Sequence, residues 1–338
     1  MTDGRAPTVL TVILNYRTAA MTLDAAAAAI VAMERIAGEI IIVDNDSRDG
    51  SFEAMRDGVA AAGWTRVRVI ASGHNGGYGA GNNVGIRAGL TDGSAPDYVY
   101  ILNSDAFPAP GAIAPLIAYL EAHPEVGLAG SHIHGPDGVA HHTAFRFPSV
   151  ASELEGAARL GPLSRLLARH RVARDLPTEI EAVDWLAGAS VLMRRSMLDA
   201  VGVFDEGFFL YFEETDLCLR ARRAGWATVY VPASRVTHLG SVSTGMKEWT
   251  RTPRYWFDSR LRYFSRNHGP AYAAAATLAH LAGGLIWQAR RALTRHPSID
   301  PPRFLRDLAG HALVSVLPRR PPPPARPSPT VAEPLPRP

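Results

Sequence analysis

The chain has 338 residues and 47% of them are apolar, which excludes disorder over most of its length and suffices for one large domain or two smaller ones. The single cysteine, Cys218, excludes an internal disulfide framework and a cysteine-rich metal site, and we expect it in the core. The residues after Met1 are polar and form no apolar signal-peptide core, so a cleaved N-terminal signal is not expected.

Charge is unevenly distributed along the chain. Residues 1–250 carry 21 basic and 28 acidic side chains, whereas residues 251–320 carry 12 basic and 3 acidic ones. A basic C-terminal module therefore follows a slightly acidic body. Such a module suits an anionic membrane surface or another polyanion. The alternative is that its arginines only solvate helix faces.

The first half of the chain alternates between β-branched apolar runs and helical stretches. Strands are predicted at Thr8–Asn15, Glu39–Asp44, Arg66–Ala71, Asp97–Asn103 and Val126–Ile133. Helical stretches are predicted between them, at Ala19–Glu34, Ser51–Ala62, Tyr78–Leu90 and Gly111–Ala122. This alternation predicts an α/β fold with a parallel sheet covered on both faces. Right-handed crossovers would align the carboxyl ends of the strands along one edge, where open α/β sheets bind ligands.

Asparagine and aspartate follow four consecutive predicted strands. The residues are Asn15, Asp44, Asn75, and the pair Asn103 and Asp105. Such residues also make good turns after strands, but their repetition favours one shared polar site. A carboxylate after a strand, as in Asn103-Ser104-Asp105, can hold Mg²⁺ or Mn²⁺ against a diphosphate.

A glycine-rich segment, NGGYGAGNNVG at residues 75–85, enters the third helical stretch and would let the backbone approach a ligand closely. It does not fit the dinucleotide pattern G-x-G-x-x-G. A phosphate-binding P-loop is also excluded, because the only lysine is Lys247, far along the chain. Dinucleotide oxidoreductases and P-loop NTPases therefore lose support.

The second half is less regular over residues 134–182 and then returns to predicted elements: a strand-like run at Val183–Arg194, a helix at Thr215–Ala224 and a strand at Ala227–Pro232. Residues 251–317 read as helical, and residues 318–338 are proline-rich and expected to be disordered. We see no internal repeat.

An uncharged stretch of 19 residues, Ala271–Ala289, is long enough to cross a bilayer as a helix. Its alanine-rich composition favours instead a helix that is packed or lies at an interface. Arg290 and Arg291 follow directly, which suits an anionic membrane surface.

Three carboxylates, Glu213, Glu214 and Asp216, follow the aromatic run FFLYF. Apolar surroundings raise a carboxyl pKa and suit the group to general-base work. The alternative is an acidic helix N-terminus that is stabilised by the helix dipole.

Histidines offer a second kind of candidate site. His238 follows a predicted strand and is either a metal ligand or a structural residue. Four more histidines flank the turn at Gly135–Gly138, where a solvated hairpin is expected ahead of a metal site: His132, His134, His141 and His142.

The order of these motifs resembles glycosyltransferase family 2, most closely its rhamnosyltransferase-like bacterial members. The resemblance covers about residues 8–265 and is carried by VILNY, IIVDNDSRDGS, NGGYGAGNNVGI, YILNSD, WLAGASVLMRR, FDEGFFLYFEETDLCLR and the segment AGW…YVP…VTH. It implies a GT-A fold, in which helices flank a Rossmann-like, mostly parallel sheet. The implied organisation is a catalytic domain at 1–250, a helical basic module at 251–317 that could associate with a membrane, and the tail at 318–338.

The resemblance also implies roles for individual residues. It implies a catalytic role for Glu214 or, as the open alternative, Asp216. The implied nucleotide-sugar contacts are Asn15, Asp44, Asn75, Gly77, Asn83, Asn103 and Asp105. The implied acceptor contacts are Trp185, Gly188 and Glu213, and the implied metal ligands are Asp105 and His238. Two positions depart from the family pattern: Asn103 stands where many members have aspartate, and Glu214 stands where the rhamnosyltransferase subset often has aspartate.

The implied activity is an inverting, Mg²⁺- or Mn²⁺-dependent transfer of a sugar from a nucleotide-sugar to a glycan or lipid-linked glycan, in cell-surface polysaccharide synthesis. dTDP-rhamnose is the first expected donor, and no nucleic-acid partner is expected. The implied location is cytoplasmic, peripheral at the inner face of the cell membrane. Two alternatives stay open, a non-catalytic nucleotide-sugar-binding scaffold and a sugar nucleotidyltransferase. A nucleotidyltransferase would need a basic, glycine-rich triphosphate loop near the N-terminus, which residues 14–20 lack.

Overall fold

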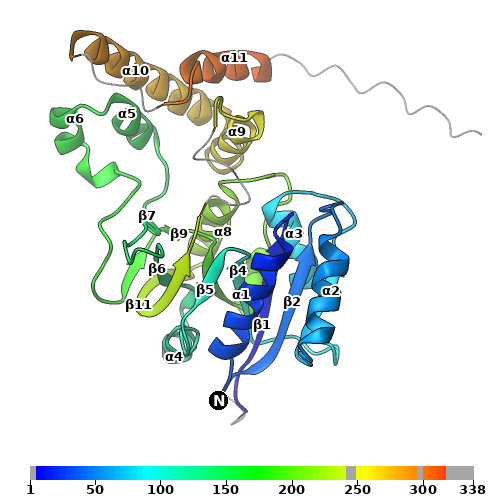
Figure 1. The fold of residues 1–338 in the computed structure, drawn as a ribbon. Helices are drawn as coiled ribbons and strands as arrows, with labels where there is room; N and C mark the ends of the chain where they lie inside the picture. Colours follow the sequence, from blue (N-terminus) through cyan, green and yellow to red (C-terminus); the bar gives the residue numbers. More distant parts are fainter. Residues whose placement is uncertain (1–4, 241–248, 295–299, 317–338) are drawn as a thin grey trace, which may run out of the picture.

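The computed structural model describes residues 5–240, 249–294 and 300–316, so the proline-rich tail predicted to be disordered lies outside the described residues. A sheet with flanking helices forms the body, and a layer of helices lies beyond one end of it (Figure 1). The strands are β1 Thr8–Asn15, β2 Ala37–Asp44, β3 Val67–Ala71, β4 Tyr98–Asn103, β5 Ala106–Pro108, β6 Val126–His134, β7 Ala144–Phe145, β8 Glu181–Val183, β9 Trp185–Leu186, β10 Ser190–Arg194 and β11 Ala227–His238. The helices are α1 Ala19–Ala32, α2 Ser51–Ala61, α3 Tyr78–Ala88, α4 Ala114–Ala122, α5 Val150–Ala158, α6 Gly161–Leu166, the 3₁₀ turn Ala168–His170, α7 Arg195–Val201, α8 Glu213–Arg223, α9 Arg254–His268, α10 Pro270–Thr294 and α11 Phe304–Val316.

Within the described residues, nine strands form one mixed sheet in the order β3-β2-β1-β4-β10-β6-β11-β5, with β8 paired to β11. Strands β1, β2, β3 and β4 pair in parallel, as do β6 and β11. The α/β class with a mostly parallel sheet is therefore confirmed. Strand β10 lies antiparallel between β4 and β6, and β5 and β8 pair antiparallel with β11.

The predicted run Val183–Arg194 is not one strand. It breaks into β8, β9 and β10, with residues 187–189 between the last two outside any strand. That break brings a short loop to the carboxyl end of β4, where the Asn103 N–H donates to the Ala189 carbonyl over 3.0 Å. The irregularity therefore places this loop beside the polar strand ends.

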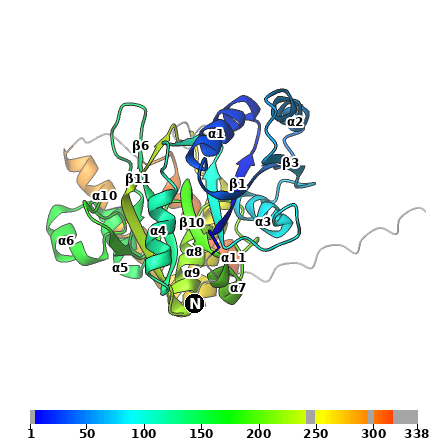
Figure 2. The same cartoon turned by 90° about the horizontal axis from the view of Figure 1, so that it is seen from below.

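Helices cover both faces of the sheet, as predicted (Figure 2). The alternation along β1 shows why: Val9 and Ile13 pack into a core with α1, α2 and α4, whereas Leu10 and Val12 pack into a second core with α3, α7 and α8. Cys218 is buried in that second core, as expected. Two buried layers therefore hold the sheet rigidly under its polar edge.

The glycine-rich helix α3 packs unusually close to β1. A Cβ atom at Gly81 would lie 2.5 Å from Leu14 Cδ1, and one at Gly85 would lie 2.5 Å from Val12 Cγ1. These glycines, one helical turn apart, therefore serve helix-to-sheet packing rather than the ligand approach expected from the sequence.

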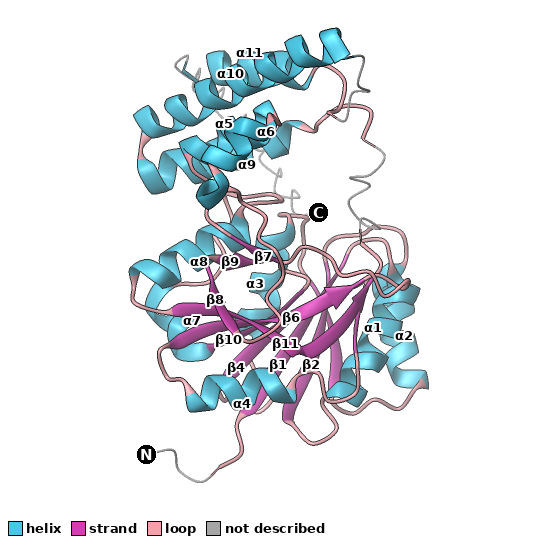
Figure 3. Ribbon diagram, turned by 90° about the vertical axis from the view of Figure 1, so that its left-hand side faces the viewer, coloured by secondary structure: helices cyan, strands magenta, loops and turns pink. Residues whose placement is uncertain are grey.

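The helices predicted at 251–317 are confirmed as α9, α10 and α11, and α5 from the irregular 134–182 region joins them (Figure 3). Helix α10 packs tightly on α5, because a Cβ atom at Gly283 would lie 2.6 Å from the Leu154 carbonyl oxygen. The buried Arg260 of α9 pairs with Glu153 of α5 at 2.8 Å. Within the described residues, no helix combines the length and hydropathy that a membrane crossing requires.

Candidate active site

The polar strand ends meet at one edge of the sheet, as predicted. Parallel pairing sets Asn15 opposite Asp44, and Leu14 opposite Asn103. The segment after β4 is held to the first turn of α1 by a 3.2 Å hydrogen bond from Thr18 Oγ1 to Ser104 Oγ. The carboxyl ends of β2, β1 and β4 thus lie side by side, separated by the ordinary spacing between neighbouring strands.

Asp44 is buried and locally supported. Its Oδ1 accepts hydrogen bonds from Asn15 Nδ2 at 2.8 Å and Ser47 Oγ at 2.6 Å, and its Oδ2 accepts one from the Ser47 N–H at 3.1 Å. Asn15 is fully buried, and its own Oδ1 accepts from Thr22 Oγ1 at 2.9 Å. Asn15 therefore orients Asp44 rather than facing a ligand, while Asp44 keeps acceptor capacity on Oδ2.

The loop before α3 is held by side-chain amides. Asn75 Oδ1 accepts from Asn45 Nδ2 and from the Gly77 N–H, each at 3.0 Å. Gly77 has a φ of +91°, and a Cβ atom there would lie 1.9 Å from the Phe209 carbonyl oxygen. Glycine is therefore required at position 77 for contact with another loop of the protein, whereas we expected it to face a ligand.

Asn83 does not reach the polar edge. It is fully buried, its Nδ2 donates to the Phe204 carbonyl and to Glu206 Oε1, and its Oδ1 accepts from the Phe204 N–H. The expected contact between Asn83 and a nucleotide is corrected accordingly: the side chain fastens α3 to the 204–206 loop, and its polar atoms are already used.

Asp105 and His238 form the candidate cation site. Antiparallel pairing of β5 with β11 brings them together, and His238 Nε2 lies 3.0 Å from Asp105 Oδ1. Asp105 is 5% exposed, and Asn103 Oδ1, two residues earlier, is a buried acceptor without a hydrogen-bond partner in the part of the chain that the structure describes. One carboxylate, one imidazole and a spare amide oxygen fit a divalent cation that takes its other ligands from phosphate and water. No cluster of three acidic, histidine or cysteine side chains suited to a metal occurs in the described part of the chain.

The histidine hairpin is as expected. His134 pairs with Ala140 across the Gly135–Gly138 turn, and His132 Nδ1 lies 2.6 Å from Tyr230 Oη. The ring centroids of His141 and His238 are 6.1 Å apart, so the hairpin borders the candidate cation site.

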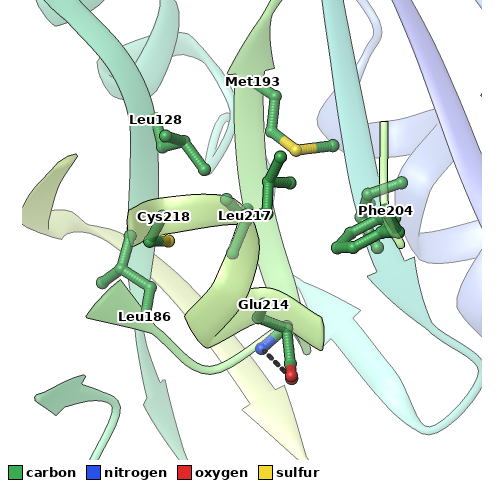
Figure 4. A pocket seen from close by; sticks show the side chains of 10 residues that line it. Leu128, Leu186, Met193, Phe204, Glu214, Leu217 and Cys218 are labelled. Carbon is green, nitrogen blue, oxygen red and sulfur yellow. Dashed lines mark hydrogen bonds between the residues drawn. The ribbon is translucent and has the colours of Figure 1, made fainter. Parts of the chain in front are cut away.

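Glu214 lies at the start of α8, facing the loop between β9 and β10. Its Oε1 accepts a 3.2 Å hydrogen bond from the Gly188 N–H, drawn as a dashed line in Figure 4. Behind it lies an apolar cavity of about 10 Å³, walled by side chains that include Leu186, Leu217 and Cys218. That volume holds about one water molecule, so the cavity forms the backing of the site and not a substrate pocket. Burial against this wall raises the pKa of Glu214, opposed by its backbone hydrogen bonds.

Gly188 is confined between two functional groups. A Cβ atom there would lie 2.8 Å from Tyr78 Oη and 2.9 Å from Glu214 Oε1. Tyr78 donates its hydroxyl to the Gly188 carbonyl at 2.8 Å, and the Gly188 N–H donates to Glu214, so one residue links the α3 tyrosine to the α8 carboxylate. Burial, followed by the charges of Glu214, Glu213 and Asp105, holds the pKa of the Tyr78 hydroxyl well above its usual value. Three acidic groups of the site therefore act on this tyrosine.

Glu213 is buried beside Glu214, and its Oε2 has no hydrogen-bond partner among the described residues. Burial first, and the charge of Glu214 second, raise the pKa of Glu213 well above its usual value. Burial therefore raises the pKa of both carboxyls, and the charge of Glu214 adds to the rise at Glu213. Tyr211 and Phe212 precede them at φ of 69° and 70°, a strained backbone that is typical of functional sites.

Asp216, the alternative base, faces the other way. It is fully buried, pairs with Arg220 Nε at 2.8 Å and accepts from Asn267 Nδ2 at 2.8 Å. Its carboxylate ties α8 to α9, and both of its oxygens already have partners.

Trp185 lies in β9, three residues before Gly188. Its ring stacks on Phe145 with centroids 4.1 Å apart, and its Nε1 donates to the Arg146 carbonyl at 2.9 Å. The half-buried ring flanks the loop that carries Gly188.

Sequence reasoning missed two features of the site. Tyr78 lies inside the glycine-rich motif, where only its neighbours were considered. A cluster of half-buried or exposed aromatic rings borders the start of α8, with centroid separations of 5.4–6.4 Å; its members are Phe209, Tyr211, Trp249 and Tyr255. The aromatic run before the carboxylates was the available signal for this cluster.

Comparison with known families matches residues 6–264 to the family described as glycosyltransferase like family 2. The chain is 36% identical over 219 residues to N-acetylglucosaminyl-diphospho-decaprenol L-rhamnosyltransferase of Mycobacterium tuberculosis (strain CDC 1551 / Oshkosh), covering 61% of this chain and 68% of that protein. It is 28% identical over 193 residues to rhamnosyltransferase WbbL of Escherichia coli (strain K12), covering 56% and 70%.

Solved structures show a shared fold at low identity. Mannosyltransferase PcManGT from Pyrobaculum calidifontis, in complex with GDP-Man and Mn2+, superposes with a TM-score of 0.53 at 14% identity, covering 93% of this chain and 89% of that one. TarS 1-349 of S. aureus, in complex with UDP-GlcNAc, superposes with a TM-score of 0.52 at 10% identity, covering 90% and 80%. The predicted GT-A fold is therefore confirmed.

Proposed function

Because the chain belongs to glycosyltransferase family 2, we propose that it transfers one sugar from a nucleotide-sugar to an acceptor hydroxyl with inversion at the anomeric carbon. The observation that carries this proposal is the position of Glu214. Its carboxylate has a raised pKa and accepts from the Gly188 N–H, and the next residue, Ala189, accepts from the N–H of Asn103 at the polar end of β4.

In the proposed reaction, Glu214 takes the proton of the acceptor hydroxyl as that oxygen bonds to the anomeric carbon. The bond between the anomeric carbon and the diphosphate oxygen breaks on the opposite face, and its electron pair leaves with the nucleoside diphosphate. A single displacement of this kind inverts the configuration. Raising the pKa of a carboxyl toward the working pH makes it a stronger base, and burial supplies that effect here.

We assign the donor side to Asp44, Asn75, Asn103 and Asp105. Asp44 would accept from the base or ribose through Oδ2, the atom with spare capacity. Asp105 and His238 would hold Mg²⁺ or Mn²⁺, whose charge would stabilise the departing diphosphate. We assign the acceptor side to Trp185, Gly188 and Glu213, which flank Glu214 from two elements.

The finer assignment is rhamnosyl transfer to a lipid-linked acceptor. The relatives from M. tuberculosis and E. coli are named rhamnosyltransferases, and the former name specifies an N-acetylglucosaminyl-diphospho-decaprenol acceptor. We propose dTDP-rhamnose as the donor and a diphosphate-linked lipid saccharide as the acceptor, used at the cytoplasmic surface of the membrane.

The test is a panel of nucleotide-sugars, each incubated with Mn²⁺ and a diphosphate-linked N-acetylglucosamine lipid. We expect release of dTDP from dTDP-rhamnose together with a rhamnosylated lipid of inverted anomeric configuration. Release of another nucleoside diphosphate with glycosylated lipid would correct the donor only. Binding without any release would refute transfer, and diphosphate formed from a nucleoside triphosphate and a sugar phosphate would indicate a nucleotidyltransferase.

A further inference from the structure

The outward face of α10 is apolar, the reverse of an ordinary surface helix. Its buried side packs on α5, α9 and α11 through small residues and Trp287. Its outer side carries Leu278, Leu285 and Leu293, which are 66%, 62% and 86% exposed. The remaining exposed residues of this helix carry no charge; they are Pro270, Ala271, Ala274, Ala275, Ala282, Ile286, Gln288, Ala289, Ala292 and Thr294. An uncovered apolar stripe of this length marks an interaction surface.

Helix α11 continues this surface. In Figures 1 and 3 it lies beside α10 in the outermost layer, on the side of the molecule away from the sheet. A Cβ atom at Gly284 of α10 would lie 2.4 Å from Leu305 Cδ2 of α11, so the two helices are in close contact. Leu313 and Val314 of α11 are 72% and 59% exposed.

The charges around this surface are basic. Helix α10 contains no acidic residue and carries Arg291 in its last turn, while Arg290 turns to the buried side and donates to the Arg159 carbonyl. Exposed Arg303 and Arg306 stand at the start of α11, and the one acidic residue of α11, Asp307, is paired with Arg251. A second copy of the chain would oppose this basic rim with an identical one, whereas an anionic lipid surface complements it.

We propose that the paired outer faces of α10 and α11 dock on an anionic lipid bilayer, with the α10 leucines inserted at the interface and the helix lying in the membrane plane. This deepens the proposed function, because it names the surface by which the enzyme would meet a lipid-linked acceptor. A helix with an apolar face, a basic end and too little hydropathy to cross a membrane has the composition of an interfacial helix. The docking differs from binding by charge alone, since inserted leucines are not screened by salt.

The first test uses the full chain and vesicles of phosphatidylcholine with about 30% phosphatidylglycerol, the anionic lipid that basic segments recognise. The L278E/L285E variant places two charges on the outer face of α10. Both side chains are exposed, so folding should not change, and a thermal unfolding scan checks this. We expect vesicle binding to fall at least about tenfold, because two leucines lose their apolar transfer. The control is Val31→Glu, at an α1 residue that is 51% exposed, and it should bind as the parent does.

A second measurement reports insertion directly. The only cysteine, Cys218, is buried, so Leu285→Cys and Val31→Cys can each be labelled at one site with an environment-sensitive dye. Vesicles should shift the dye emission to the blue at position 285 and leave it unchanged at position 31. Equal spectra at the two positions, or equal vesicle binding by L278E/L285E and Val31→Glu, would overturn the proposal.

Two readouts separate this inference from its alternatives. Sedimentation velocity without lipid should show one species for the parent and for L278E/L285E; a dimer that dissociates in the variant would overturn lipid docking in favour of self-association. Nucleoside diphosphate release with a short-chain, water-soluble acceptor should be the same in both proteins. If neither protein releases the diphosphate while the parent still binds vesicles, the proposed function fails and the docking surface stands.

Discussion

Glu214→Gln is the substitution that isolates proton removal from positioning. Glutamine keeps the length of the side chain and keeps an oxygen that can accept the Gly188 N–H, now 3.2 Å from Glu214 Oε1. It removes the negative charge and the capacity to take a proton. Donor binding depends on groups from other elements, so we expect the affinity for nucleoside diphosphate to be unchanged.

The magnitude follows from the loss of one general base. Such a group contributes about 10²–10⁴-fold to a rate. A loss of this size corresponds to about 2.7–5.5 kcal/mol of transition-state stabilisation. We therefore expect kcat to fall by at least about 10²-fold with little change in donor KM. Glu125→Gln provides a matched control, because that side chain is 63% exposed and its ion-pair partner is His123, which is not a residue of the site.

The assay measures nucleoside diphosphate release across pH. In the parent enzyme, turnover should fall as pH falls through the raised pKa of Glu214, because only the ionised carboxylate accepts a proton. The acid limb should therefore lie above the ordinary carboxyl range, and residual turnover of Glu214→Gln should lack it. A variant with parental kcat, or with the same acid limb, would refute the assignment of the base.

Three further substitutions probe other parts of the site. Asp105→Asn should weaken nucleoside diphosphate binding in Mn²⁺ about tenfold or more, because it removes the negative charge of the residue that would hold the metal. Calorimetry with and without a chelator measures this, and equal affinities of the two proteins would contradict it. Tyr78→Phe removes the 2.8 Å hydrogen bond to Gly188 and should lower kcat about tenfold, with parental donor KM; an unchanged kcat argues against a positioning role. At a pH above the ordinary carboxyl range, Glu213→Gln should raise the free energy of unfolding by about 1 kcal/mol or more, because the raised native pKa of Glu213 costs the parent stability as pH rises. The urea midpoints of the two proteins should converge at acid pH. A difference in midpoint that persists at acid pH would contradict the reasoning.

The sequence was sufficient to predict that the strand ends meet, because the alternation of strands and helices indicates a parallel sheet and parallel strands end at the same edge. Once β1, β2 and β4 are parallel neighbours, Asn15, Asp44 and Asn103 must share an edge. The carboxylates after the aromatic run were predicted for a similar reason, because the apolar residues that surround them are their neighbours in the sequence.

Which polar residues face the site could not be predicted in the same way. Asn83 and Asp216 have the residue types of a binding site, yet their partners, Phe204 and Asn267, come from distant segments. Only tertiary packing shows that their polar atoms are already used. The break at Ala187–Ala189 was not predicted for a related reason. An apolar run in the sequence does not indicate where a strand is interrupted, because that depends on tertiary contacts.

The contact between Gly77 and Phe209 has an evolutionary consequence. With 1.9 Å between a hypothetical Cβ and the Phe209 carbonyl oxygen, no side chain enters at position 77 unless the main chain leading to α8 retreats. Drift in the loop before α3 is thereby coupled to drift in the segment that leads to Glu213 and Glu214. A homologue that abandons this glycine must reshape the approach to α8 as well, so the two segments should diversify together.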